Sequence, residues 1–149
     1  MKNYPIQEDN QNSVEEPMAI YISDSFLKSN VLDNLAQNSK ELFTKVISIS
    51  GLTIKTLAEN IFEITPKTFI KYKNNQTKIP SRIAELAIEL STLFELGNEI
   101  FGGSSAFNGW LEKENVFFNY KKPVIFLNTS TGIHLIFEEL KRIEFGATA

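Results

Sequence analysis

The chain has 149 residues, of which 42% are hydrophobic and 22% are charged, and it contains no cysteine. This length fits one ordinary domain, or two very small ones that share a core. The absence of cysteine excludes disulfides and thiolate metal sites, and no apolar run approaches the roughly 20 residues that span a bilayer. We therefore expect a cytoplasmic protein with no secretory signal and no membrane partner.

The net charge of −3 hides a segregated distribution of charge. Residues 1–38 hold six acids against two lysines, whereas residues 66–82 hold five bases and no acid. One basic stretch in an acidic protein indicates an anionic partner. A solvated helix face that happens to be rich in lysine explains the same charges equally well.

The first half of the chain predicts an acidic arm followed by three short helices. Residues 1–38 are polar at their start and lack a clear apolar period, so we expect them to form a flexible arm. Apolar residues at helical spacing begin near Ser39, and Gly51 ends that first helix. Thr53 suits the N-cap of a second helix. A third helix opens at Thr65-Pro66, where the missing N–H of proline costs nothing.

The second half predicts a long helix, a short one and a final one. Pro80 starts the longest helix, whose apolar stripe runs through residues 83–101. Gly102 breaks this helix, and Ser104 or Ser105 caps a short helix that ends near residue 111. The last helix covers about 129–145. Residues 124–127 are apolar enough for a short strand but have no partner strand, so the chain is predicted to be all-α.

The sequence offers no set of residues that would assemble an enzyme site. The single histidine, His134, lies beside the apolar stripe of the last helix. No HExxH, GxGxxG or GxxxxGK[ST] string occurs. Because a nucleophile, a base and an orienting group are not brought together, we expect a protein that is not an enzyme and that holds no cofactor and no metal.

Residues 39–82 match the plan of a helix-turn-helix domain, in which the later helix enters the major groove of DNA. On that third helix Phe69 is expected to be core. The exposed lysines would neutralise phosphates, while Thr68 or Asn75 would meet base edges. The candidate DNA-binding residues are Lys67, Thr68, Lys71, Tyr72, Lys73, Asn75 and Lys78. The alternative is a degenerate domain that serves only as scaffold or dimer surface.

The C-terminal part resembles a known family in an ordered set of residues. The run IFGGSSAFNGWL at 100–111, then Asn115, Thr129 and the closing LKRIEFGATA at 140–149, is similar to the toxin-binding domain of Xre/MbcA/ParS-like antitoxins. We take residues 83–149 as this helical domain. Its structural signature residues are Phe101, Gly102, Trp110, Leu111, Pro123 and Gly132. Phe101, Phe107 and Trp110 are expected to be core, and the two glycines to serve backbone geometry.

The resemblance implies an antitoxin that silences a RES-domain toxin, which attacks NAD or uses it to modify a target protein. It also implies that the end of the chain lies at the toxin's active-site entrance. The toxin-binding candidates are Arg142, Glu144, Phe145, Gly146, Ala147, Thr148 and Ala149. A homodimer and operator DNA are further expected partners, the homodimer also from the apolar stripe along 83–101. The alternative is a stand-alone transcriptional regulator whose C-terminal domain only dimerises.

One irregularity marks the first half of the resemblance. Phe62-Glu63 occupies the turn where a glycine is frequent in the family. The spacing from Ala58 to Phe69 is also one residue longer than the family pattern.

Overall fold

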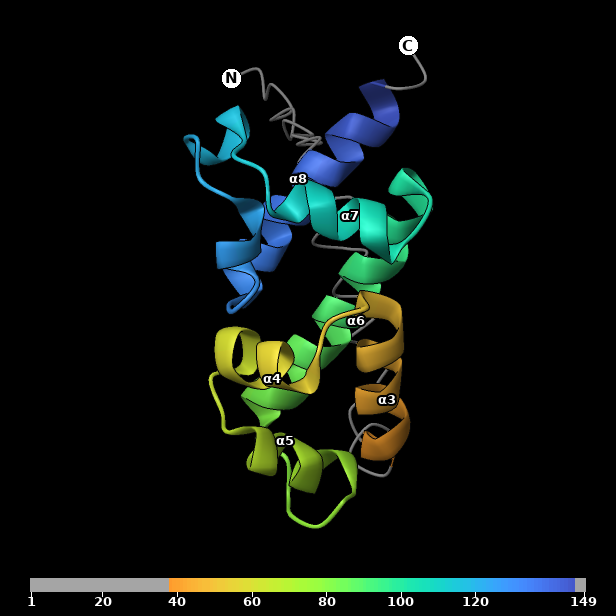
Figure 1. Ribbon diagram of the computed structural model, residues 1–149, viewed down its shortest axis with the longest axis vertical. Helices are drawn as coiled ribbons and strands as arrows, with labels where there is room; N and C mark the ends of the chain where they lie inside the picture. The colour runs from red at the N-terminus through yellow and green to blue at the C-terminus, as the bar shows by residue number, and fades with distance from the viewer. Residues whose placement is uncertain (1–37, 147–149) are drawn as a thin grey trace, which may run out of the picture.

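The computed structural model describes residues 38–146 of the 149 (Figure 1). These residues form helices and no β-strand, which confirms the predicted all-α fold for this part of the chain. The expected acidic arm at 1–38 lies outside the described residues, apart from Asn38. In chain order the elements are α3 Ser39–Ser50, α4 Ile54–Thr56, η1 Leu57–Phe62, α5 Pro66–Lys73, α6 Ser81–Phe101, α7 Ser104–Leu111, η2 Val116–Phe118, η3 Pro123–Phe126 and α8 Ser130–Gly146.

The helix boundaries follow from local chemistry in the first half. Gly51 ends α3 in the left-handed region at φ 64°. Thr53 and Thr65 each cap a helix, because the side-chain hydroxyl accepts the backbone N–H three residues on at 3.1 Å. Pro66 occupies the first turn of α5, where no hydrogen bond is lost. These ends agree with those predicted from the sequence.

The segment between Ala58 and Phe69, where the sequence spacing looks irregular, begins with a π-helical turn. Helix α4 continues directly into η1, which is a π-helix. A π turn holds more residues than an α turn. The segment ends at Glu63, which adopts the left-handed conformation at φ 55°. The backbone N–H of Ile64 then donates to the carbonyl of Ala58 at 2.9 Å.

One local prediction in the second half is wrong, and one open point is decided. Residues 124–127 are apolar but are predicted without a partner strand, and the structure forms no strand there: Pro123–Phe126 is a 3-10 helix. The wrong prediction concerns the cap of α7. The N-cap of α7 is Gly103 at φ 147°, not Ser104 or Ser105, and no side chain caps this helix. The other boundaries hold: Gly102 ends α6 at φ 85°, and the Thr129 hydroxyl accepts the N–H of Gly132 at 3.0 Å at the start of α8.

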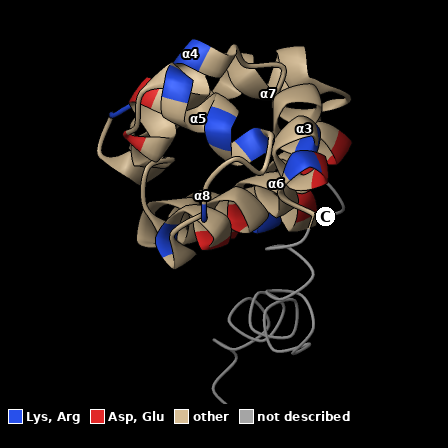
Figure 2. Cartoon of the chain, turned by 90° about the horizontal axis from the view of Figure 1, so that it is seen from below, with Lys and Arg blue, Asp and Glu red and all other residues tan. Residues whose placement is uncertain are grey.

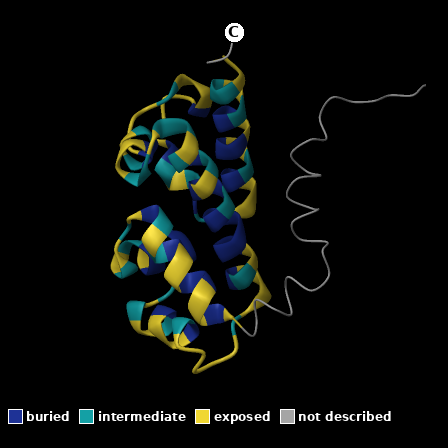
Figure 3. Cartoon of the chain, turned by 90° about the vertical axis from the view of Figure 1, so that its right-hand side faces the viewer, coloured by how far each residue is buried: buried dark blue, intermediate teal, exposed yellow. Residues whose placement is uncertain are grey.

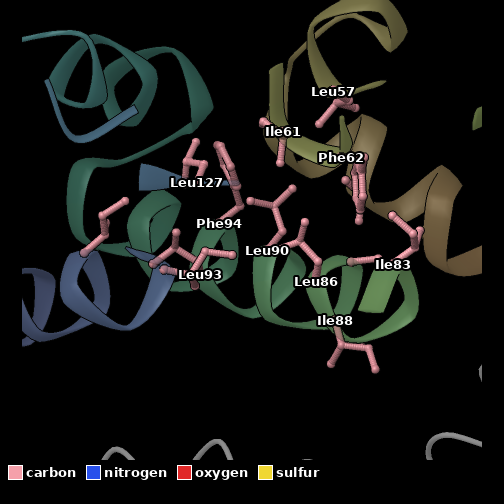
Figure 4. Packing of buried hydrophobic residues seen from close by; sticks show 14 of the residues in the cluster. Leu57, Ile61, Phe62, Ile83, Leu86, Ile88, Leu90, Leu93, Phe94 and Leu127 are labelled. Atoms are coloured by element: carbon pink, nitrogen blue, oxygen red, sulfur yellow. The ribbon is translucent and has the colours of Figure 1, made fainter. Parts of the chain in front are cut away.

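Helix α6 is the shared centre of the molecule. It packs against α3, α7 and α8. The contact with α3 reaches the C-terminal part of α6, where the Asn98 side chain donates to the carbonyl of Ile49 at 2.8 Å. Figure 4 shows Leu86 and Leu90 on the side of α6 that faces Ile61 and Phe62, while Phe94 lies beside Leu127. One cluster of buried hydrophobic residues therefore runs from α3 to α8. The domain boundary expected at residue 83 falls in the first turn of α6. Helix α6 as a whole contributes to the packing of both halves.

The first part of the apolar stripe of α6 is covered within the chain. Between residues 83 and 94 its large apolar members are at most 3% exposed; these are Ile83, Leu86, Leu90, Leu93 and Phe94. Ile100 and Phe101, at the end of the stripe, are half-buried. The homodimer remains a prediction from the family resemblance.

Candidate functional site

Two surfaces at opposite ends of the long axis carry the predicted site residues (Figure 1). Helix α5 and the loop that follows it form one end, and the C-terminal half of α8 lies at the other. Figure 3 shows that the loop after α5 is made of exposed residues, and residues 74–78 are all exposed. The two surfaces differ in chemistry: the first is basic, and the second is mixed apolar and charged.

The α5 surface presents lysines beside one apolar side chain. Lys67 and Lys71 are exposed one turn apart, and Ile70 between them is 42% exposed. Lys73 is partly exposed and Lys78, in the following loop, is exposed. Viewed from this end, Figure 2 shows lysine and arginine positions on α4 and α5. The arrangement suits a polyanion such as the DNA backbone, because lysine ammonium groups bind phosphates as point charges.

Three other candidates on this surface are engaged by the protein itself. Tyr72 is predicted to be exposed, but it is 9% exposed and its ring lies 6.3 Å from that of Phe43. It lies three residues after Phe69, so both rings face the core. The hydroxyl of Thr68 pairs with that of Thr65 at 2.9 Å. Asn75 is exposed, has a φ of 56°, and accepts a hydrogen bond from the Ser39 hydroxyl at 3.4 Å.

The turn before α5 is held by side chains from the rest of the molecule. Arg82, at the start of α6, donates to the carbonyl of Phe62 at 3.2 Å. Asn128, just before α8, donates to the Glu63 carboxylate at 3.2 Å. Both contacts hold the irregular turn that separates η1 from α5.

The outer face of α8 forms the second surface. Leu135, Glu138, Arg142 and Phe145 are all exposed and follow one another at spacings of three and four residues. Leu135 is 38% exposed and Phe145 is 71% exposed. Sequence reasoning points to Arg142 and Phe145 but misses Leu135 and Glu138. The helical spacing of the sequence could have identified these two, because they lie on the face of the helix that the buried stripe of Ile133, Ile136 and Leu140 leaves open to solvent.

Arg142 is held in a fixed orientation by Glu139. Its Nε and Nη2 atoms donate to the two carboxylate oxygens at 2.7 and 2.6 Å. Glu139 is only 2% exposed, whereas the side chain of Arg142 is 67% exposed. The hydrogen bonds and negative charge of Glu139 raise the pKa of Arg142 above its usual value. A guanidinium fixed on one edge still offers its other donors to a partner's carboxylate or phosphate.

The remaining toxin-binding candidates differ in their surroundings. Glu144 accepts from Lys141 at 2.9 Å, so it is paired along the helix. Gly146 ends α8. The other three predicted residues, 147–149, lie outside the described residues.

The apolar signature residues of the C-terminal half serve packing. Phe101 stacks on the buried Phe107 at 5.8 Å and lies 5.6 Å from Trp110. Leu111 is 1% exposed and Pro123, which opens η3, is buried. Phe101 and Trp110, both expected to be core, are half-buried at its edge.

The structural role of Gly132 differs from the one predicted. The sequence suggests that it serves the backbone geometry of a tight entry to the last helix. In the structure it has an ordinary helical conformation, but a Cβ there would lie 2.0 Å from the carbonyl oxygen of Phe126. Helix α8 therefore packs directly on the backbone of η3, which only glycine permits.

A cluster at the start of α8 has catalytic residue types but a structural arrangement. The Ser130 hydroxyl donates to the carboxylate of Glu89 at 2.5 Å, and His134 Nε2 lies 3.6 Å from the same group. In a Ser–His–acid triad the hydroxyl donates to the imidazole, whereas here it donates to the acid. Glu89, 8% exposed, thus anchors the first turn of α8 to α6. Within residues 38–146, His, Asp and Glu side chains form no group of three that suits a metal ion.

Comparison with known proteins identifies the C-terminal part. Residues 96–146 match the family model of the antitoxin Xre/MbcA/ParS C-terminal toxin-binding domain, which confirms the family recognised from the sequence. The match supports an antitoxin role. No curated protein matches the chain. None of the described helices is both long enough and apolar enough to cross a membrane.

Proposed function

Because residues 96–146 belong to an antitoxin family's toxin-binding domain, we propose that the protein is the antitoxin of a type II toxin–antitoxin pair. In this proposal it neutralises a RES-domain toxin, an enzyme that consumes NAD or uses it to ADP-ribosylate a target. Helix α8 and residues 146–149 cover the toxin's NAD site. The protein acts in the cytoplasm as an inhibitor and not as an enzyme.

The proposal rests on the positions of the exposed hydrophobic side chains. Seven large hydrophobic side chains are exposed in the part of the chain that the structure describes, and six of them lie within residues 96–146. The six are Val116, Phe117, Tyr120, Ile125, Leu135 and Phe145. Exposed apolar surface of this kind is typical of protein–protein contact sites. The matched domain is therefore the part best suited to hold a protein partner.

The outer face of α8 provides anchors of the kind that dominate such contacts. Phe145 and Leu135 offer apolar surface on one helical stripe, and Arg142 lies between them with its orientation already fixed by Glu139. Aromatic and arginine residues supply most of the binding energy in typical interfaces. A guanidinium that is already ordered loses less entropy on binding.

The test replaces the two apolar anchors of α8 and measures affinity for the toxin. In the double variant Leu135→Ser, Phe145→Ser we expect the Kd to rise roughly 100-fold, because two side chains no longer bury apolar surface against the toxin. Both side chains are exposed, so the fold is expected to persist, and circular dichroism checks this. The control is Glu59→Ala, Asn60→Ala on the exposed face of η1. An unchanged Kd for the α8 variant contradicts the proposal.

The part played by residues 146–149 is tested separately by removing them. If they enter the toxin's NAD site, the shortened protein neutralises the toxin less well while still binding through α8. Undiminished neutralisation rules out tail insertion and leaves the α8 contact in place.

A second role, autorepression, is favoured by the exposed lysines of α5. We propose that the helix-turn-helix half binds the promoter of its own operon, with Lys67 and Lys71 on phosphates. The competing hypothesis is a stand-alone regulator whose C-terminal domain only dimerises. Co-purification with the protein encoded by the adjacent gene separates the two, because only an antitoxin brings a toxin with it.

A further inference from the structure

The loop between α7 and α8 gathers most of the exposed apolar surface. Among the described residues, four of the seven exposed large hydrophobic side chains lie within ten residues of one another. Val116 is 68% exposed, Tyr120 70% and Ile125 54%. None of these side chains is among the toxin-binding candidates that the family resemblance implies. In Figure 1 the loop stands out from the body of the molecule beside α7.

Tyr120 is held in a backbone conformation that a bulky residue rarely adopts. The N–H of Lys121 donates to the carbonyl of Phe118 at 3.1 Å, which closes a four-residue turn. Its two central residues, Asn119 and Tyr120, have φ values of 54° and 62°. Positive φ at both positions defines a type I′ turn, for which asparagine followed by glycine is the preferred pair. Tyrosine in the glycine position strains the backbone.

The strained conformation of Tyr120 is not offset by packing of its ring against the described part of the chain. The ring of Tyr120 is 70% exposed, so it contributes little to the core. Strained residues of this kind persist where they serve a function. A tyrosine that destabilises its own turn and faces solvent has the properties of a side chain kept for a partner.

The rest of the loop braces the turn in one conformation. The backbone oxygen of Asn115 accepts the N–H of Tyr120 at 2.9 Å, and its side chain accepts that of Phe117 at 2.8 Å. Phe118, 5% exposed, fixes the turn to the core through Phe126, with ring centroids 5.4 Å apart. Tyr120 is thus presented on a rigid support, which lowers the entropy lost on binding.

We propose that this turn is a second anchor for the toxin, with Tyr120 inserted into an apolar pocket on the toxin's surface. The proposal rests on the proposed function, because the loop lies inside the segment that matches a toxin-binding domain. Tyr120 and Val116 supply contact area that α8 does not, since they belong to a separate loop. The toxin is thereby held at two places.

The experiment exploits the opposite effects that the proposal predicts on stability and binding. Tyr120→Gly relieves the strained position, so we expect the melting temperature of the free protein to rise. Its Kd for the toxin is expected to rise roughly 10- to 100-fold, as when an aromatic hot spot is removed. Tyr120→Asn, which tolerates the same backbone conformation, should weaken binding similarly and shows that the ring matters. The matched control is Asn119→Gly, which changes the other central residue of the turn to one that also accepts positive φ, keeps the ring and should bind as the wild type.

The outcomes separate this inference from the proposed function. A wild-type protein that binds no toxin overturns both. Toxin binding that disappears on α8 substitution but is unchanged in Tyr120→Gly and Tyr120→Asn overturns only the second anchor. A shift in the oligomeric state of the free protein, with toxin affinity unchanged, assigns the turn to a second copy of this chain and also overturns the proposal.

Discussion

At the scale of single residues, the glycines separate two physical requirements that look alike in a sequence. Gly102 is needed for its left-handed backbone at φ 85° and has open space where a Cβ would be. Gly132 and Gly97 have helical backbones, and a Cβ at either would overlap a neighbour: the Phe126 carbonyl at 2.0 Å or the Phe107 ring at 2.3 Å. The first requirement is conformational, and the second is close packing between elements.

A glycine in close contact with a neighbouring element and a helical glycine with open space around it should respond in opposite ways to replacement by alanine. Gly132→Ala forces α8 away from the backbone of η3, and we expect the free energy of unfolding to fall by about 2–4 kcal/mol. Gly109→Ala, in the middle of α7 with nothing within 4 Å, should instead gain up to about 1 kcal/mol, because alanine is the better helix former. Chemical denaturation of the two variants measures both values. Equal effects would contradict the packing role of Gly132.

Single residues also show where sequence reasoning succeeds and fails. The caps Gly51, Thr53 and Thr65 are predictable because capping depends on a residue and its nearest neighbours. The burial of Tyr72 is predictable from its spacing to Phe69, yet its phenol suggests a surface role. The strain at Tyr120 is not predictable from its residue type, because tyrosine rarely adopts the positive φ that the turn gives it.

At the scale of elements, the segment near residue 60 is predicted only in part. The long spacing from Ala58 to Phe69 indicates an irregularity, but the sequence does not say what form it takes. The structure has a π-helical turn at Leu57–Phe62, followed by α5 with its Thr65 cap. Likewise the sequence locates the loop at 115–128 but not its two 3-10 helices, whose short turns leave no periodic pattern.

An intact, exposed α5 allows a direct test of promoter binding. We expect the variant Lys67→Ala, Lys71→Ala to weaken binding to the protein's own promoter uniformly across sequences. The slope of log K against log salt should fall in magnitude by about 2, one for each phosphate that is no longer neutralised. The control variant is Lys113→Ala, Lys121→Ala, which removes the same charge from exposed positions in the segment between α7 and α8. If both variants change the slope equally, net charge and not α5 governs binding.

At the scale of the whole molecule, the two predicted domains share one helix. On α6, the buried residues Leu86 and Leu90 lie on the side that faces η1. Phe94, which is also buried and follows them along the helix, lies beside Leu127 (Figure 4). The apolar stripe at 83–101 predicts this helix correctly. Its division between two partners is not predictable, because a stripe shows that a face is buried and not what covers it.

A shared core predicts that the two halves unfold together. Phe69→Leu, in the half formed by residues 39–82, loosens a ring that packs 5.0 Å from Phe43, and we expect the free energy of unfolding to fall by about 1–2 kcal/mol. The sole tryptophan, Trp110, lies in the other half and reports on it by fluorescence. Because α6 joins both cores, the midpoint seen by Trp110 should fall as much as that seen by circular dichroism. Asn60→Ala, exposed in the same half, should move neither midpoint. A Trp110 midpoint unmoved by Phe69→Leu would instead mean that residues 39–82 and 83–149 fold as independent domains.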